Sequence, residues 1–511
     1  MGIIGLYRIC ALAALGLCAL LAAPVARAQP LTPADTTEKQ VDILQANRLS
    51  RAIFGEDPVQ VLEGQVHLRQ EQTDLWADRV VRYLEQDRVI LTGRVMIVER
   101  GDSLRADSIV YNTRLKQGQA TGRVHLTDGD VQVYAPSALY YADEKRTDFD
   151  REVRLIDSRT VLTSRGGQYY SDEKQAEFYR DVVLDEDRTH LEADSITYFR
   201  ETEVSIGRGN VFVQRIGGGE GVAESDTLSQ SFLFGAYAFN DNRSGYSQIE
   251  GDALLVQFRR DSTGVDADTL LMRALRLDVI RDDSLQRLIA VDSVRVWQKT
   301  FAAVADSSVY DRITREGRPL REENRFYVRP MAWYEQYQLS GDTLRATATA
   351  GSIDSLFIRE NAFAAQEDTS VARIHQLRGQ HLVGIFRADS LRSLTVGPTA
   401  ESIYYRNDGE GAVDGAMRAS GDTIVLRFAA NELKRISIVS GTQNVYYAAS
   451  LIPSPFELEG FAWRPEWRPA KDTLLDADRR ARLDAFRASA DVGRSLHSPR
   501  NVGGSVGMAI K

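Results

Sequence analysis

The sequence Gly64-Gln65-Val66-His67-Leu68 returns along the chain at a fixed interval of 29 residues. Gly93-Arg94-Val95-Met96-Ile97 follows it, and Gly122-Arg123-Val124-His125-Leu126 comes next. A fixed period indicates an array of one repeated supersecondary unit, because such units bury their apolar faces by stacking on one another. The remaining copies are Arg151-Glu152-Val153-Arg154-Leu155, Arg180-Asp181-Val182-Val183-Leu184 and Gly209-Asn210-Val211-Phe212-Val213.

A second element keeps the same period, as Leu75-Trp76-Ala77-Asp78 and Leu104-Arg105-Ala106-Asp107 show. In both elements apolar residues alternate with polar ones, which is typical of a strand with one buried face. The alternation slips between Ala106 and Ile109, which predicts a β-bulge. Turn clusters such as Asp128-Gly129-Asp130 separate the strands. Each unit is therefore predicted to be two strands and two turns, and the fold all-β and elongated. Further members of this element and its tyrosine are Val133-Tyr134-Ala135-Pro136, Leu162-Thr163-Ser164-Arg165, Leu191-Glu192-Ala193-Asp194, Tyr111, Tyr140, Tyr169 and Tyr198.

Composition narrows the functional classes. The chain has 511 residues, of which 43% are apolar and 26% charged, as in ordinary folded proteins. The formal net charge of −9 argues against general nucleic-acid binding, which needs a basic face. The two cysteines, Cys10 and Cys18, both lie near the N-terminus, which excludes a disulfide scaffold, a cysteine-ligated zinc site and a catalytic thiol elsewhere.

The N-terminus reads as a secretory signal over residues 1–28. Arg8 precedes an apolar run over residues 9–23, and Ala26-Arg27-Ala28 forms a small-residue cleavage pattern that leaves Gln29 first in the mature chain. The alternative is an uncleaved membrane anchor. The protein is therefore predicted to be exported. That its compartment is the periplasm, with possible association with inner- or outer-membrane components, is implied only by the resemblance given below.

The rest of the chain divides by composition. The repeat region is predicted over residues 29–216, a Gly-rich linker over 217–224 and a second β-rich region over 225–452. Residues 453–511 form a Pro-rich C-terminal segment, with a short amphipathic helix over residues 472–488, capped by Asp472, and a disordered tail.

The signal and the strand motifs together resemble the OstA/LptA family of periplasmic lipopolysaccharide-transport proteins. The resemblance lies in Leu104–Tyr111, Leu191–Tyr198 and Gly209-Asn210-Val211, and it covers residues 41–215. The remainder is similar to the long OstA-like proteins of Bacteroidota, and the second β-rich region is then OstA-like too. The chain departs from a typical LptA in its greater length, and from LptD because it lacks a long series of barrel strands.

The resemblance implies an elongated β-jellyroll bent into an open V, whose apolar groove takes the acyl chains of lipid A. It implies a non-enzymatic carrier with no cofactor, which binds lipopolysaccharide or a related glycolipid. The implied partners are other Lpt-type bridge components and an outer-membrane translocon, and head-to-tail homo-oligomers can form by strand addition at the open sheet ends. Rim arginines would contact the lipid phosphates. The groove candidates form two inward columns of the repeat: Val66, Val95, Val124, Val153, Val182 and Val211, with Leu68, Ile97, Leu126, Leu155, Leu184 and Val213.

Two other interpretations stay open. The two columns are also expected of a fully packed core, and the chain would then be a secreted structural or interaction β-solenoid with no lipid ligand. A hydrolase with an unrecognised carboxylate pair is a third and weaker hypothesis.

Isolated motifs add no catalytic or metal site. Gly503-Gly504-Ser505-Val506-Gly507 matches G-x-S-x-G, but no strand precedes it as a nucleophile elbow requires. His67 and His125 occupy equivalent repeat positions that alternation places on the solvent face. Asp-rich pairs lack the spacing of a calcium loop and are predicted to be turn residues. Trp76 also lies on the predicted solvent face, where it is equally expected to pack against a side chain of the neighbouring strand.

Overall fold

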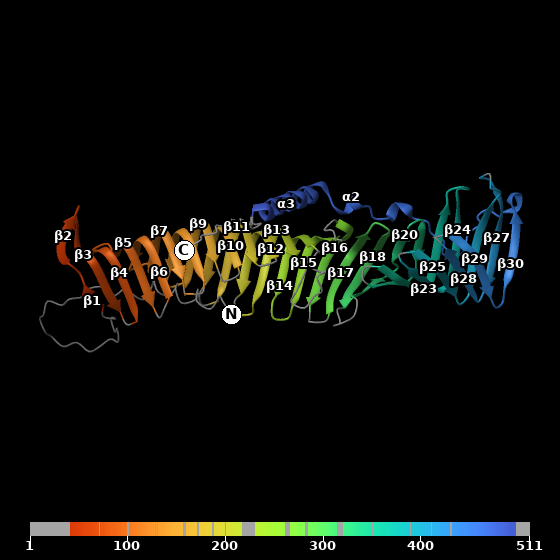
Figure 1. The fold of residues 1–511 in the computed structure, drawn as a ribbon. Coiled ribbons are helices and arrows are strands. Elements are labelled where there is room, and N and C mark those ends of the chain that lie inside the picture. The colour runs from red at the N-terminus through yellow and green to blue at the C-terminus, as the bar shows by residue number, and fades with distance from the viewer. Residues whose placement is uncertain are drawn as a thin grey trace, which may run out of the picture.

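The protein is a long, narrow stack of antiparallel strands (Figure 1). The computed structural model describes residues 41–496 apart from short gaps, of which residues 217–229 and 314–319 are the longest. Within these residues thirty strands join in one sheet. The predicted all-β class and elongated form are therefore confirmed. The signal at residues 1–28 and the tail motif at 503–507 lie outside the described residues.

The strands of the first half are β1 (Asp42–Gln45), β2 (Arg48–Phe54), β3 (Asp57–Gln70), β4 (Thr73–Tyr83), β5 (Arg88–Glu99), β6 (Asp102–Asn112), β7 (Gln117–Thr127), β8 (Gln132–Tyr141), β9 (Arg146–Ile156), β10 (Thr160–Tyr170), β11 (Gln175–Glu186), β12 (Thr189–Phe199), β13 (Val204–Ile216), β14 (Gln230–Asp241) and β15 (Tyr246–Arg260). Those of the second half are β16 (Asp266–Arg281), β17 (Leu285–Trp297), β18 (Phe301–Ile313), β19 (Arg321–Tyr327), β20 (Met331–Tyr334), β21 (Tyr337–Ser340), β22 (Thr343–Thr349), β23 (Ser352–Asp368), β24 (Arg373–Arg387), β25 (Ser390–Gly397), β26 (Ala400–Asn407), β27 (Val413–Gly421), β28 (Thr423–Ala429), β29 (Glu432–Val439) and β30 (Gln443–Ala448).

Every second strand of the repeat region bends sharply at one point, which we call the corner, and the corner recurs with the 29-residue period. In β5, Gly93 and Arg94 both have positive φ, 73° and 46°, and the register with β6 shifts between Thr92 and Val95. Two consecutive left-handed residues bend the strand into two arms. The register of β6 with β7 shifts between Arg105 and Ser108, so the predicted bulge is confirmed.

The corner glycine is required where an aspartate faces it. A Cβ at Gly93 would lie 2.4 Å from Asp78 Oδ2, and Asp78 in turn accepts a hydrogen bond of 2.6 Å from Arg94. Gly122 with Asp107 and Gly209 with Asp194 repeat this arrangement. Where the period places Pro136 and Arg165 instead of aspartate, the corner residues are Arg151 and Arg180, which still have positive φ. The corner glycine therefore accompanies a facing aspartate, or Asn47 in the case of Gly64.

The same architecture continues beyond the middle of the chain. Strand β13 pairs with β14, so the sheet passes the predicted linker at residues 217–224 without a break in the strand order. After β18 the two arms continue as separate strands, since β19 pairs with one end of β18 and β20 with the other. They rejoin in β23, which pairs with β22 through one arm and with β21 through the other. The second β-rich region thus extends the stack built by the repeats.

The core lies between the two arms. One apolar cluster runs along the stack and contains residues from both arms of a strand, for example Leu91 and Val95 of β5. The tyrosines that keep the period lie on the arm opposite the valine column. Tyr111, Tyr140 and Tyr169 are buried there, and Tyr198 is half-buried.

The C-terminal segment runs back along the outside of the stack. After β30 it contains η2 (Ala449–Leu451), η3 (Pro465–Trp467), α2 (Lys471–Leu474) and α3 (Ala477–Leu496), and the helices lie along the middle strands (Figure 1). The predicted helix over 472–488 is correct in place but wrong in continuity. The chain is extended at Leu475, and Asp476 rather than Asp472 caps α3 by accepting a hydrogen bond from the Arg479 amide. None of the helices described here combines the length and apolarity needed to cross a membrane.

Candidate functional site

The valine column of the repeat lies deep between the arms. Val66, Val95, Val124, Val153, Val182 and Val211 follow the corner directly, and each is at most 1% exposed. Their alternation with outward residues fixes this orientation, because successive side chains of a strand point to opposite faces. This column forms the floor of the interior.

The second column is closed at one end of the stack and open in the middle. Leu68, Ile97 and Leu126 are at most 4% exposed, whereas Leu155, Leu184 and Val213 are only partly buried. Cross-strand pairing joins Leu184 to Leu191, Leu191 to Val213, Val213 to Leu233, and Leu233 to Leu255. We call these partly buried side chains the open row: Leu155, Leu184, Leu191, Val213, Leu233 and Leu255.

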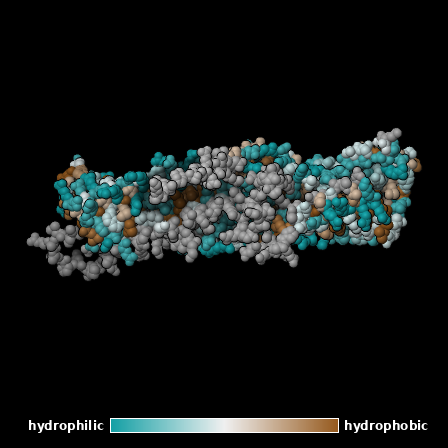
Figure 2. All heavy atoms as spheres, in the orientation of Figure 1, coloured by the Kyte–Doolittle hydropathy of each residue, from teal (hydrophilic) through white to brown (hydrophobic). Residues whose placement is uncertain are grey.

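The open row gives the interior an apolar surface that a ligand can reach. It runs from β9 to β15, with the buried Leu162 between Leu155 and Leu184. Figure 2 shows a patch of hydrophobic surface near the middle of the molecule. Half-buried aliphatic side chains in a continuous row are suited to long apolar chains, since burial of apolar area is not directional.

Arginines stand at the ends of the strands that line this opening. Arg215 occupies the next inward position after Val213 on β13, and Arg281 the next after Val279 on β16. Burial, together with the nearby charge of Arg215, lowers the pKa of Arg281 to about 10. The alternation Leu277-x-Val279-x-Arg281 places Arg281 on the inward face of its strand.

On the outer face of the same strands, aromatic side chains form a platform for the C-terminal helices. Phe212, Phe232, Phe234 and Phe258 pack with Leu254, Val256 and Leu271, and Leu474, Leu475, Leu483 and Phe486 cover them. We call residues 471–488 the strap. The Phe212 and Phe234 rings lie 5.1 Å apart, and Phe486 lies 5.4 Å from Phe212. This contact was not predicted from the sequence, although four phenylalanines at outward positions of β13 to β15 are a signal for a covering element.

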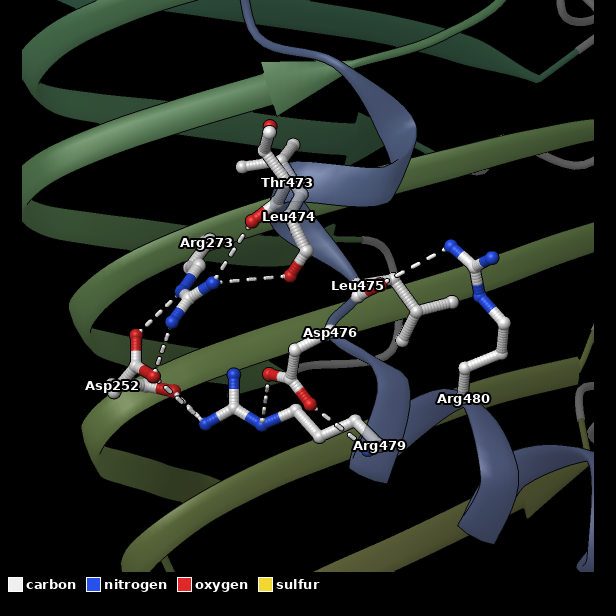
Figure 3. Close-up of polar contacts among 8 residues, drawn as sticks. All are labelled: Asp252, Arg273, Thr473, Leu474, Leu475, Asp476, Arg479 and Arg480. Atoms are coloured by element: carbon white, nitrogen blue, oxygen red, sulfur yellow. Dashed lines mark hydrogen bonds and ion pairs between the residues drawn. The ribbon is translucent and has the colours of Figure 1, made fainter.

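Ion pairs and hydrogen bonds tie the strap to the stack, and Figure 3 shows those around Asp252. Asp252 accepts two hydrogen bonds of 2.6 Å from Arg273 and one of 3.0 Å from Arg479. Arg273 also donates to the carbonyls of Thr473 and Leu474, which end α2. Further along α3, Arg482 donates to Glu192 on β12.

These contacts shift the pKa values of both carboxyl groups. The hydrogen bond from Arg273 lowers the pKa of Asp252; burial opposes this, and the charge of Arg479 adds to it. Burial alone would raise the pKa of Glu192, but hydrogen bonds from His190 and Arg482 outweigh it and lower the pKa. Both carboxylates are therefore ionised at neutral pH.

The two predicted solvent-face histidines take part in cross-strand stacking. His67 stacks on Trp76 with ring centres 4.6 Å apart and hydrogen-bonds Asp74 at 2.7 Å, and His125 stacks on Tyr134 at 4.5 Å. Trp76 is thus a packing residue. Over the described part of the chain, no group of three or more His, Cys, Asp and Glu side chains could hold a metal ion.

Comparison with known proteins agrees with the strand repeat. A family model described as OstA-like protein matches residues 38–194. Over these residues the chain is similar to the OstA-like family. The OstA-like match ends at Asp194, within β12. The later strands of the open row, β13 to β15, therefore lie outside the matched residues.

Among solved structures, the chain is similar to LptH from Pseudomonas aeruginosa, the LptA-homologous periplasmic component of the lipopolysaccharide transport device. The two are 15% identical over 28% of this chain and 84% of LptH, with a TM-score of 0.16. A likeness this low supports no conclusion about this chain. No curated protein matches it.

Proposed function

We propose that this protein is a non-enzymatic periplasmic carrier that holds lipopolysaccharide or a related glycolipid by its acyl chains and passes it toward the outer membrane. The observation that carries the proposal is the open row, an apolar surface left partly exposed along the middle of the stack. The OstA-like match over residues 38–194 supports the assignment to lipopolysaccharide transport.

The energetics favour acyl chains as the occupant. Each buried CH₂ group contributes about 0.8 kcal/mol, so a few chains lying along the open row would hold a lipid firmly. An opening along one side lets the bulky saccharide stay in water. Because the floor valines are already buried, we propose the open-row members Leu155, Leu184 and Val213 as the candidates in direct contact with lipid, above the buried floor.

The ends of the stack are suited to protein partners. Strands β1 and β2 pair only with β3 among the described strands, and Ile43, Leu49 and Ile53 on them are exposed. At the far end β29 and β30 carry the exposed Val439 and Val445. Free strand edges accept further strands. We propose that they join other bridge components, an outer-membrane translocon or a second copy placed head to tail.

The competing function, a structural β-solenoid with a packed core, is favoured by one observation. The first three members of the second column, Leu68, Ile97 and Leu126, are buried as a packed core requires. The two functions differ in what the middle strands do, and a bound lipid decides between them.

Mass spectrometry of lipid bound to the purified full-length protein tests the carrier function. Glycolipid should accompany the wild type, and Val213→Asp should abolish it, since a carboxylate in the open row repels acyl chains. Leu275→Asp is the matched control, because Leu275 is 56% exposed at a corner. Absence of lipid from the wild type, or equal lipid on both variants, would overturn the proposal.

A further inference from the structure

The arm that faces the open row has an inward row of its own at the same depth. In β5, Val89 and Ile97 each occupy the second inward position from the corner, one on either arm. Cross-strand pairing continues the position of Val89 from strand to strand as far as Leu288 on β17. We call this row, from Val89 to Leu288, the facing row. It lies across the interior from the open row, because the inward side chains of both arms meet in one core.

The facing row opens and closes together with the open row. From β5 to β10 its residues are buried, and from β11 to β15 they are only partly buried. Val279 and Leu288 then close it again on β16 and β17. On the other arm Met272 and Val296, the next members after Leu255, are buried on the same two strands. The two arms therefore share one opening over β11 to β15, with closed strands on both sides.

The chemistry of the facing row changes within this opening. In the closed part, Tyr111, Tyr140 and Tyr169 fill the row with aromatic rings. On β13, β14 and β15 the same positions hold three uncharged polar residues, which we call the polar lip: Ser205, Asn240 and Ser247. The last three members of the open row lie across from them on the same strands. This part of the opening thus has one apolar wall and one wall of neutral hydrogen-bonding groups.

The polar lip keeps hydrogen-bonding capacity that the fold does not use. Asn240 Nδ2 donates to Asn242 Oδ1 at 2.8 Å, and Asn240 Oδ1 accepts from Ser247 Oγ at 2.7 Å. A side-chain amide has two donor hydrogens and two acceptor positions, so Asn240 retains one of each. Among the described residues, the hydroxyl group of Ser205 has no hydrogen-bond partner. The lip can therefore both donate to a ligand and accept from it.

We propose that the polar lip binds a hydroxyl group on an acyl chain of the amphiphile whose chains lie on the open row. This inference rests on the proposed carrier function and narrows its ligand to lipids with hydroxylated chains. A hydroxyl group donates and accepts at once, which matches the positions left on Asn240 and Ser205. The lip carries no charge, so it favours a neutral group over an ionised one, whose desolvation it would not offset.

The position of the lip indicates where on the chain the hydroxyl lies. β13 begins at Val204 and β14 ends at Asp241, so Ser205 and Asn240 are one residue from the edge of their arm. A hydroxyl near the head-group end of the chain would lie at this edge. An acyl chain without the hydroxyl would cover the polar lip and leave its groups unpaired, which costs free energy. The opening should therefore discriminate between the two kinds of chain.

Binding is tested with N-(β-hydroxymyristoyl)glucosamine and N-myristoylglucosamine, which differ by one hydroxyl group, titrated into the full-length protein. The wild type should bind the hydroxylated lipid about threefold to tenfold more tightly, in keeping with one neutral hydrogen bond. Ser205→Ala and Asn240→Leu should each reduce this ratio without weakening the binding of the plain lipid.

Thr147→Val is the matched control. Thr147 belongs to the facing row between Tyr140 and Tyr169, and its Oγ1 atom is buried without a hydrogen-bond partner. The change removes a hydroxyl from the same row in its closed part, so the ratio of the two affinities should stay at the wild-type value. A ratio that falls as far in Thr147→Val as in Ser205→Ala would overturn the proposal.

The remaining outcomes separate the hydroxyl site from the carrier function. If both lipids bind the wild type equally tightly, the hydroxyl site is wrong while the groove stands. If Asn240→Leu weakens both lipids alike and Ser205→Ala leaves the ratio unchanged, the polar lip only shapes the fold and the site is again wrong. If neither lipid binds the wild type, the carrier function itself fails, and the hydroxyl site fails with it.

Discussion

The strands from β3 to β8 and those from β11 to β16 belong to one stack of bent antiparallel strands, yet they differ on both faces. In the first group the second inward column is closed, and the outward row is polar and stacked, with His67 on Trp76 and His125 on Tyr134. In the second group the same column is partly exposed and the outward row is aromatic and covered by the strap.

The difference shows how a stack of strands can leave apolar side chains of its interior partly exposed and still stay folded. Apolar area left exposed on the inner face is matched by apolar area buried on the outer face of the same arm, at β12 to β15. The strap thus stabilises the arm from outside while the interior stays accessible. Opening and strap should therefore depend on one another, and the N-terminal strands should depend on neither.

The largest effect is expected from removing a strap anchor. Leu483→Ala should destabilise docking of the strap by about 2–5 kcal/mol, because Leu483 is 1% exposed and its truncation leaves a cavity on the aromatic platform. Hydrogen exchange should then accelerate in β12 to β16 and stay unchanged in β3 to β8.

Leu451→Ala is the control for that variant, since Leu451 is 70% exposed and the change should cost less than about 0.5 kcal/mol. Faster exchange spread evenly over the whole stack would mean that the two regions do not differ in what holds them.

A smaller effect, confined to the other region, is expected at the corner. Gly93→Ala should destabilise β4 to β6 by roughly 1–3 kcal/mol, because the new Cβ meets Asp78 and φ is 73°. Arg151→Ala, at the equivalent corner, should change stability by less than about 0.5 kcal/mol. Local unfolding free energies from hydrogen exchange measure both, and equal losses would refute the pairing of glycine with aspartate.

The smallest effect is the pH dependence of the strap. Folded-state pKa values of Asp252 and Glu192 are lowered, so their stabilisation is fully present above the ordinary values of 3.8 and 4.5 and is lost as the pH falls through the lowered ones. Spin labels on cysteines introduced at Asp478 and Leu275 should separate in acid. For this labelling, Cys10 and Cys18 are the two native cysteines that must be replaced.

Asp252→Asn tests the assignment of that titration. It should loosen the strap by about 1 kcal/mol at neutral pH, an exposed pair being partly screened, and reduce the separation that acid causes. A strap that opens at the same pH in this variant and in the wild type would be held by its apolar contacts alone.

The sequence predicts the strands well and the strap poorly, for physical reasons. A 29-residue period with alternating Val66 and Leu68 specifies strands, face and stacking, since these depend on local pattern. The corner was visible as Gly93-Arg94, but Arg151-Glu152 takes the same backbone conformation without glycine, so composition alone could not define it.

Contacts such as Arg482 with Glu192 join residues 290 positions apart, and no local pattern contains them. The same holds for the division of the second column. Ile97 is buried and Val213 is only partly buried, although both are branched aliphatic residues of the same column. The difference depends on the residues around them, so it cannot be predicted from the identity of either residue.

One measurement tests the central claim most directly: site-specific photocrosslinking in living cells with a diazirine side chain close to leucine in size, placed at Val213 or at Ile97. Both face the interior in the same column, and they differ in exposure. The account predicts glycolipid adducts at Val213 and none at Ile97. Adducts at neither position, or at Ile97 as abundantly as at Val213, would contradict it.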